Sequence, residues 1–240
     1  MAAPRPWSAI PIHDDGEPLE ELPPELLRLE PHPYASLGAP YGEGASPFRL
    51  RSGVIRRLQA AQEALQQDEE GWRLAIFDAW RPVAVQRFMV AHSIEAECRA
   101  RGFERAGASA SDLLEVEEAV AHFWAPPSTD PATPPPHSTG GAVDLTLADA
   151  SGRPLGMGGE IDAIGPVSEP DHFAEAATAD PGSEAALWQG RRDRLAAVMA
   201  GAGFARHPNE WWHFSHGDQL WAWGSGEPAA RYGRTGEPLD

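Results

Sequence analysis

A proline-rich segment over residues 125–136, APPSTDPATPPP, is the feature that most limits how this chain can fold. Proline fixes φ and lacks a backbone N–H, so this segment can form the interior of neither a helix nor a central strand. It nevertheless leads directly into residues 137–147, HSTGGAVDLTL, whose last part is typical of a strand. An irregular segment therefore delivers His137 to the start of a strand.

Hydrophobic periodicity predicts the regular elements around this segment. Apolar residues at helical spacing predict helices over 52–67, 82–100, 111–123 and 184–202, with Ser52 as the N-cap of the first. Short apolar runs predict strands over 72–77, at the end of 137–147, and over 210–214 and 220–223. Because no βαβ alternation is visible, this order predicts an α+β fold in which an antiparallel sheet is flanked by helices.

Two segments show little periodicity. Residues 1–47 are rich in Pro, Gly and acidic residues, which predicts an irregular N-terminal arm wrapped on the domain. Residues 151–183 predict a long loop, longer than compact domains usually keep without a functional reason. The length of 240 residues suits one sizeable core, so we expect residues 1–240 to form a single domain.

The charge balance narrows the class of partner. The chain has 36 acidic and 19 basic residues, a formal charge of -17, and this field argues against nucleic acid and anionic membranes. Cys98 is the single cysteine, so no intramolecular disulfide can form, and we expect it to be a small semi-buried helical residue. The N-terminus lacks the apolar core of a signal peptide and no run approaches a membrane span, which predicts a soluble cytoplasmic protein. A mature periplasmic form, trimmed of its leader, stays open.

Two histidines and one carboxylate have the composition of a catalytic zinc site, which keeps its fourth position for water. His137 and Asp144 are separated by Gly140 and Gly141, which let the chain turn sharply so that both side chains can point to one spot. His213 would complete the set from a later strand. Without a metal, the alternative is that the histidines are hydrogen-bonded residues of the core and that Asp144 is an ordinary turn residue.

Two more charged residues are candidates for catalysis. Glu210 lies three residues before His213 and is placed to act as general base on a metal-bound water, although the HExxH motif is absent. The alternative to this catalytic role is that Glu210 is a solvent-exposed acid at the end of a strand. Arg81 could supply positive charge to a developing oxyanion, and equally could form an ordinary ion pair with Asp78 at the corner between a strand and a helix.

Three motifs together resemble the zinc D-Ala-D-Ala metallopeptidases. Residues 136–147 resemble the SxHxxGxAxD signature, residues 210–213 the ExxH motif and residues 78–82 the D-x-x-R-P segment. They occur in the order of the family, and the branch they match best is the D-alanyl-D-alanine dipeptidases, which include the vancomycin-resistance type. The resemblance implies hydrolysis of the dipeptide D-Ala-D-Ala to two D-Ala, and an α+β fold shared with the hedgehog signalling domain.

The resemblance also implies the roles of individual residues. It assigns zinc to His137, Asp144 and His213, the role of catalytic acid/base to Glu210, and stabilisation of the tetrahedral intermediate to Arg81.

Two further residues are candidates for the substrate ends. The sequence LGMGGEID over residues 155–162 resembles the dipeptidase loop, in which Asp162 would meet the substrate ammonium, and Tyr34 would line the dipeptide pocket. One position departs from the pattern, because the family serine two residues before the histidine is Pro135 here, which offers neither a hydroxyl nor an N–H. If that serine holds the substrate carboxylate, another group must do so in this chain.

Several alternatives stay open at this point. His216 is a rival ligand to His213, although residues three apart on a strand face opposite sides. Within enzymes, the alternative is a zinc D,D-carboxypeptidase or L,D-peptidase acting on cell-wall peptides, which would share the same metal residues. A catalytically silent zinc-binding module is the rival from another class, and the presence of Glu210 and Arg81 argues against it. The expected partner is a small dipeptide, and the oligomeric state is not predicted.

Overall fold

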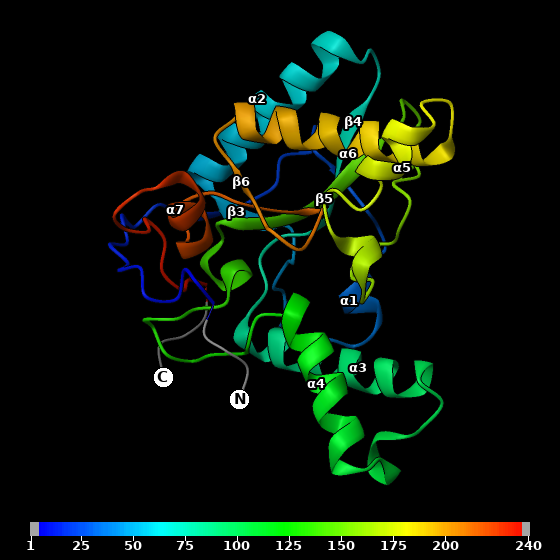
Figure 1. Cartoon of the computed structure of the whole chain (residues 1–240). Helices are drawn as coiled ribbons and strands as arrows, with labels where there is room; N and C mark the ends of the chain where they lie inside the picture. The colour runs from blue at the N-terminus through cyan, green and yellow to red at the C-terminus, as the bar shows by residue number, and fades with distance from the viewer. Residues whose placement is uncertain (1–4, 237–240) are drawn as a thin grey trace.

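A five-stranded sheet forms the centre of the computed structural model, which describes residues 5–236 (Figure 1). The strands are arranged in the order β2-β4-β5-β7-β6. Their bounds are β2 Leu27–Arg28, β4 Arg73–Asp78, β5 Ala142–Ala148, β7 His213–Ser215 and β6 Ala205–Arg206. All neighbours are antiparallel except β2, which pairs in parallel with β4 at the edge. A separate antiparallel ribbon joins β1, Leu19–Glu21, to β3, Arg49–Arg51.

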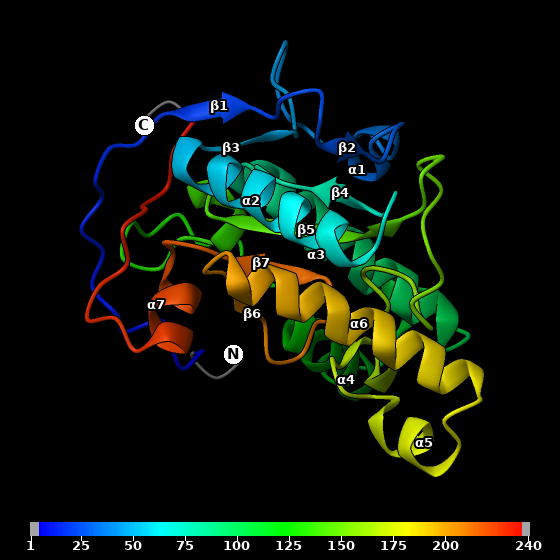
Figure 2. The ribbon, with the colours of Figure 1, turned by 90° about the horizontal axis from the view of Figure 1, so that it is seen from above.

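Helices cover the sheet on both sides. The helices are α1 Pro33–Ser36, α2 Ser52–Asp68, α3 Val83–Ala100, α4 Ala110–Phe123, α5 Ala174–Ala179, α6 Glu184–Gly201 and α7 Gln219–Ser225. Figures 1 and 2 show α2 and α6 side by side over one face of the sheet, with α3 and α4 paired on the other side. These layers confirm the predicted α+β class, with the parallel edge strand β2 as a departure from a purely antiparallel sheet.

The alternation of side chains along β5 decides where a site can form. Val143, Leu145 and Leu147 are buried in the core with apolar residues of α2 and α6. Because successive residues of a strand point to opposite faces, Asp144 and Thr146 lie on the other face of the sheet, toward α3 and α4. A buried acid is thereby held on the side of the sheet away from the main core.

Four predicted helices are present with bounds within two residues of those expected, but some local details differ. Ser52 is the first residue of α2 rather than its N-cap, which is Arg51. Residues 220–223 belong to helix α7 rather than to a strand, because the Asp218 carboxylate accepts a hydrogen bond from the Trp221 N–H at 2.8 Å and caps the first turn. Gly226, with φ +71°, ends the helix in the left-handed conformation. Two capping interactions therefore outweigh the alternating Trp-Ala-Trp pattern.

The two segments predicted to be irregular contain short regular elements. Residues 5–47 include β1, β2 and α1, and the rest of that stretch has no helix or strand. Residues 151–183 include α5 and the 3-10 turn Pro166–Ser168. Cys98 is buried in α3, where it packs with apolar residues of α3 and α4.

Among residues 5–236, none of the helices combines the length and the apolar character needed to cross a membrane.

Candidate metal centre

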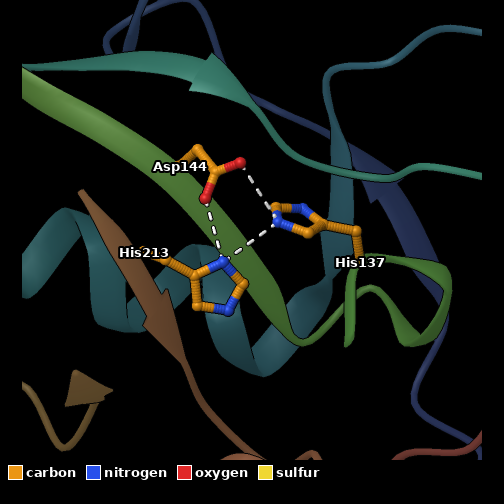
Figure 3. Close-up of side chains that lie close together, drawn as sticks. All are labelled: His137, Asp144 and His213. Atoms are coloured by element: carbon orange, nitrogen blue, oxygen red, sulfur yellow. Dashed lines mark hydrogen bonds and ion pairs between the residues drawn. The ribbon is translucent and has the colours of Figure 1, made fainter. Parts of the chain in front are cut away.

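Three buried side chains converge between β5, β7 and the turn before β5 (Figure 3). Asp144 and His213 are direct partners in the β5–β7 register, so their side chains share one face. Asp144 Oδ1 lies 3.0 Å from His213 Nδ1, and Asp144 Oδ2 lies 3.2 Å from His137 Nε2. The two imidazoles approach within 3.2 Å, between His137 Nε2 and His213 Nδ1.

A tight turn delivers His137 to this position. The 3-10 turn Pro136–Thr139 ends at Gly140, whose φ of +71° is open to glycine but strained for other residues. At Gly141, a Cβ would lie 2.6 Å from the carbonyl oxygen of His216. The Gly-Gly pair is therefore required by backbone conformation at one position and by close packing at the next, and the turn places His137 opposite Asp144.

Hydrogen bonds behind the rings determine which nitrogens face the centre. His137 Nδ1 lies 2.7 Å from the Ala79 carbonyl oxygen, which can only accept, so Nδ1 carries the hydrogen. Ser215 Oγ donates to Asp218 Oδ2 at 2.7 Å and must accept from His213 Nε2, which lies at 3.2 Å. In the neutral rings, His137 Nε2 and His213 Nδ1 therefore both present lone pairs, and their 3.2 Å approach is not a hydrogen bond.

This donor set fits a zinc ion. Two nitrogen lone pairs and a carboxylate at 3.0–3.2 Å repel one another unless a cation lies between them. Tetrahedral zinc with bonds of ~2.0–2.1 Å separates neighbouring ligand atoms by about 3.3 Å, close to the spacing observed. Arg81 Nη2 lies 3.1 Å from Asp144 Oδ2, and this positive charge favours the ionised form of the carboxyl group. The carboxylate is therefore ready to act as an anionic ligand.

Glu210 lies beside the triad, in the segment just before β7. Its Oε2 is 3.7 Å from His213 Nδ1, and its side chain lines the same cavity as the three ligands. Burial, followed by the negative charge of Asp144, raises the pKa of Glu210 well above its ordinary value. A carboxyl group with raised proton affinity at this distance is placed to exchange a proton with a water molecule at the open metal position.

Arg81 follows β4 and is nearly fully buried at the same cavity. Its Nη2 lies 2.7 Å from Asp78 Oδ2 and 3.1 Å from Asp144 Oδ2. The ion pair weighed from the sequence is therefore present, and the same guanidinium also contacts Asp144 of the triad. Burial disfavours the charge of Arg81, but Asp78 and then Tyr34 outweigh this and raise its pKa well above the ordinary value.

Asp162 and Tyr34 form a pair at another wall of the cavity. Tyr34 Oη donates to Asp162 Oδ2 at 2.7 Å, and Asp162 lines the cavity, whereas Tyr34 lies behind it on the wall of a neighbouring pocket. Asp162 has φ +67°, which is uncommon for a residue other than glycine and marks a backbone held by its surroundings. Burial and the charge of Asp144 raise the pKa of Asp162 to about 7.

The structure separates His216 from the centre. Its Nδ1 bonds to the Gly203 carbonyl oxygen at 2.9 Å, and its ring packs on Trp221. Burial lowers the pKa of His216 to about 4. Trp211 and Trp212 are buried with the main core, and Trp212 also lines the cavity.

Sequence reasoning missed four residues around the centre: Arg5, His207, Ser215 and Asp218. His207 Nδ1 lies 3.5 Å from Glu210 Oε1, and Arg5 Nη1 lies 3.0 Å from His207 Nε2. Arg5 and His207 belong to segments without a motif, so no spacing indicated them. Ser215 and Asp218 follow His213 closely, and a search for hydroxyl or carboxylate groups near predicted ligands could have found them.

A buried His-Asp-His triad with a carboxylic acid beside it fits the class of zinc hydrolases. Residues 28–229 match the peptidase family described as D-ala-D-ala dipeptidase. The chain belongs to this family of zinc peptidases.

Individual relatives agree with this assignment. A D-alanyl-D-alanine dipeptidase of Synechocystis is 47% identical over 226 residues, which cover 91% of this chain and 90% of the relative. A D-alanyl-D-alanine dipeptidase of Escherichia coli is 38% identical over 78 residues, or 32% of this chain and 36% of the relative.

Among solved structures, the vancomycin-resistance D,D-pentapeptidase VanY in complex with Zn(II) is 17% identical, with a TM-score of 0.46 and coverage of 88% of both chains. The structure described as VanYB in complex with D-Alanine-D-Alanine is 16% identical, with a TM-score of 0.46 and coverage of 92% of this chain and 93% of that one.

Proposed function

We propose that the chain works as a single zinc-dipeptidase domain that hydrolyses D-Ala-D-Ala to two molecules of D-Ala. The observation that carries the proposal is the convergence of His137, Asp144 and His213, with Glu210 beside them, in a member of this family. The Synechocystis relative is a D-alanyl-D-alanine dipeptidase and matches nearly the whole chain, which supports the choice of substrate.

Each residue of the site has a distinct task. Zinc bound by the three ligands supplies a Lewis acid that polarises the scissile carbonyl and lowers the pKa of water to ~7. Glu210 takes the proton of the attacking water and returns it to the leaving amine, which its raised pKa favours. Arg81 keeps a positive charge at the cavity, where it offsets negative charge that develops on the carbonyl oxygen. Asp162, held by Tyr34, binds the substrate ammonium.

The dimensions of the cavity favour a very small substrate. The free space among its lining residues is about 30 Å³, room for little more than a water molecule, so the walls must open and close again around the ligand. An acyl group on the substrate amine would remove its charge and leave Asp162 without a cationic partner. Mispairing of a polar group in such a site discriminates by ~10⁴ or more.

One assay tests the proposal. Zinc-loaded protein is incubated separately with D-Ala-D-Ala, L-Ala-L-Ala and N-acetyl-D-Ala-D-Ala, and release of alanine is followed, with Glu210→Gln as the inactive control. We expect release from D-Ala-D-Ala alone. Preferential cleavage of the acetylated peptide would replace the dipeptidase by a carboxypeptidase, and preference for L-Ala-L-Ala would contradict the assigned stereochemistry. No cleavage with zinc bound would indicate a silent module.

A further inference from the structure

Two arginines line the catalytic cavity, and they differ in how their charge is balanced. Arg81 is held by Asp78 and Asp144 at 2.7 and 3.1 Å. Arg5 comes from the N-terminal arm and makes no ion pair with any carboxylate in the described range 5–236. The substrate of the proposed reaction is a zwitterion, so the cavity must provide a cation for its carboxylate as well as an anion for its ammonium. Arg81 is charged but already paired with two carboxylates, whereas Arg5 is not.

The contacts of Arg5 hold the guanidinium without neutralising it. Nη1 lies 3.0 Å from His207 Nε2, and Nη2 donates to the carbonyl oxygens of Ala121 and Phe123 at 3.3 and 3.2 Å. These partners are neutral: two are carbonyl oxygens, and His207 Nε2 must accept from the guanidinium, which can only donate, so the ring is not an imidazolium. Within residues 5–236, Nε has no hydrogen-bond acceptor, and guanidinium has five N–H groups in all. Donors for a further anion are therefore available on a group whose position is already fixed.

The position of Arg5 relative to the cavities is equally specific. A second pocket of about 660 Å³ adjoins the catalytic cavity, and Arg5, Ala125 and Pro136 belong to the walls of both. Arg5 thus lies at the boundary between a large outer pocket and the smaller catalytic cavity. Pro135 and Pro136, which also face the outer pocket, have no N–H with which to bind an anion.

The charged residues are also distributed as a dipeptide requires. Arg5 and Asp162 both line the catalytic cavity, together with the three residues of the triad. They come from different segments of the chain, the N-terminal arm and the loop after β5. A dipeptide spans at most ~7 Å, so one small cavity can offer a cation to its carboxylate and an anion to its ammonium.

We propose that Arg5 binds the C-terminal carboxylate of the dipeptide substrate, which reaches the catalytic cavity through the outer pocket. This assignment rests on the proposed function and adds the group that recognises the second end of the substrate. The N-terminal arm then contributes to the specificity of the enzyme, since it carries the arginine of the cavity that is not paired with a carboxylate.

Equilibrium binding tests the assignment without turnover. Zinc-loaded Glu210→Gln is titrated calorimetrically with D-Ala-D-Ala and with D-Ala-D-Ala amide, whose C-terminus is neutral. The same titrations are made after adding Arg5→Ala, Arg5→Gln or Arg5→Lys. The matched control is Arg153→Ala, because Arg153 is strongly exposed and pairs only with Asp149 in the described chain. Zinc content and thermal unfolding are recorded for every variant, and Arg5→Gln retains N–H donors if Arg5→Ala does not fold.

We expect Arg5→Ala and Arg5→Gln to weaken binding of D-Ala-D-Ala by about 10- to 100-fold, as loss of a charge-assisted hydrogen bond does. Binding of the amide should change less than about threefold, Arg5→Lys should retain part of the affinity, and Arg153→Ala should have no effect. Equal losses for both ligands would show a merely structural role and overturn the assignment. Unchanged binding of D-Ala-D-Ala would overturn it while leaving the dipeptidase intact, whereas absence of binding in Glu210→Gln itself would overturn the proposed function as well.

Discussion

The metal side and the substrate side of the cavity are built in different ways. His137, Asp144 and His213 come from one tight turn and two paired strands, and a single β5–β7 register brings the last two together. The groups assigned to the substrate ends, Arg5 and Asp162, come from the N-terminal arm and from the loop after β5. The first region is rigid sheet, and the second is irregular chain held by side-chain contacts.

This difference assigns chemistry to the sheet and selectivity to the loops. A ligand triad tolerates little displacement, and paired strands provide that precision because backbone hydrogen bonds fix them. Recognition of a small substrate requires walls that can open, since the free space of the cavity is only about 30 Å³. Changes on the metal side should therefore abolish reaction, whereas changes on the substrate side should alter affinity or pH dependence.

The largest effect is expected from removal of a ligand. His137→Ala leaves two protein ligands, so the protein should lose its zinc and with it all measurable turnover. Elemental analysis of the purified variant is the measurement, with His216→Ala as a control, because His216 bonds to Gly203 and lies outside the triad. Full zinc occupancy in His137→Ala would mean that the metal is bound elsewhere.

The next effect is on the chemical step alone. Glu210→Gln should keep zinc and fold but lower kcat by ~10² or more, because an amide cannot take the proton of the attacking water. KM should change little, since Glu210 is assigned no contact with the substrate ends. Steady-state kinetics on the zinc-loaded variant measures both constants. If kcat is unchanged, a group other than Glu210 must activate the water.

The metal side could be predicted from the sequence because its signals are local. His137, Gly140 and Asp144 lie within one short motif, and Glu210 and His213 within another, so only the pairing of two strands had to be inferred. The four long helices were predicted for a similar reason, since their apolar periodicity does not depend on distant residues.

The substrate side could not be predicted to the same extent because it depends on contacts between distant segments. Arg5 meets His207 across 202 residues, and Tyr34 meets Asp162 across 128. No periodicity or spacing encodes such contacts. The resemblance to the family indicated Asp162 and Tyr34, but Arg5 has no counterpart in any motif, and its position became visible only with the fold.

A smaller effect on the metal side is expected from the hydrogen bonds behind His213. Ser215→Ala removes the acceptor for His213 Nε2 and breaks the link to Asp218. Loss of such support typically weakens metal affinity by about 10- to 100-fold. Competition with a zinc chelator measures the affinity. Ser138→Ala is the matched control, because Ser138 is equally buried and lies beside the other histidine, but among residues 5–236 its hydroxyl bonds only to the Pro135 carbonyl. Equal affinity in both variants would contradict the role of Ser215.

The smallest effect concerns stability and probes the substrate side without any substrate. In the zinc-free protein, the pKa of Asp162 is about 7 when folded, against an ordinary value of 3.8. The unfolded chain therefore ionises this group between about pH 4 and pH 7 while the folded chain keeps the proton, so folding stability falls as pH rises through that window. Three pKa units correspond to about 4 kcal/mol, and because Asp162 is only partly buried we expect about 2 kcal/mol.

Asp162→Asn removes this titration but keeps an oxygen that can accept from Tyr34. Relative to wild type, the zinc-free variant should therefore gain stability as pH rises from 4 to 8, and urea unfolding at several pH values measures the difference. Tyr34→Phe should leave the pH dependence of Asp162 in place and shift it further upward, because the lost hydrogen bond lowers the pKa of that carboxyl. If the free energy of unfolding depends on pH in the same way in wild type and Asp162→Asn, the loop does not hold a carboxyl group with a raised pKa. Arg5 would then be the one remaining candidate for recognition of a substrate end.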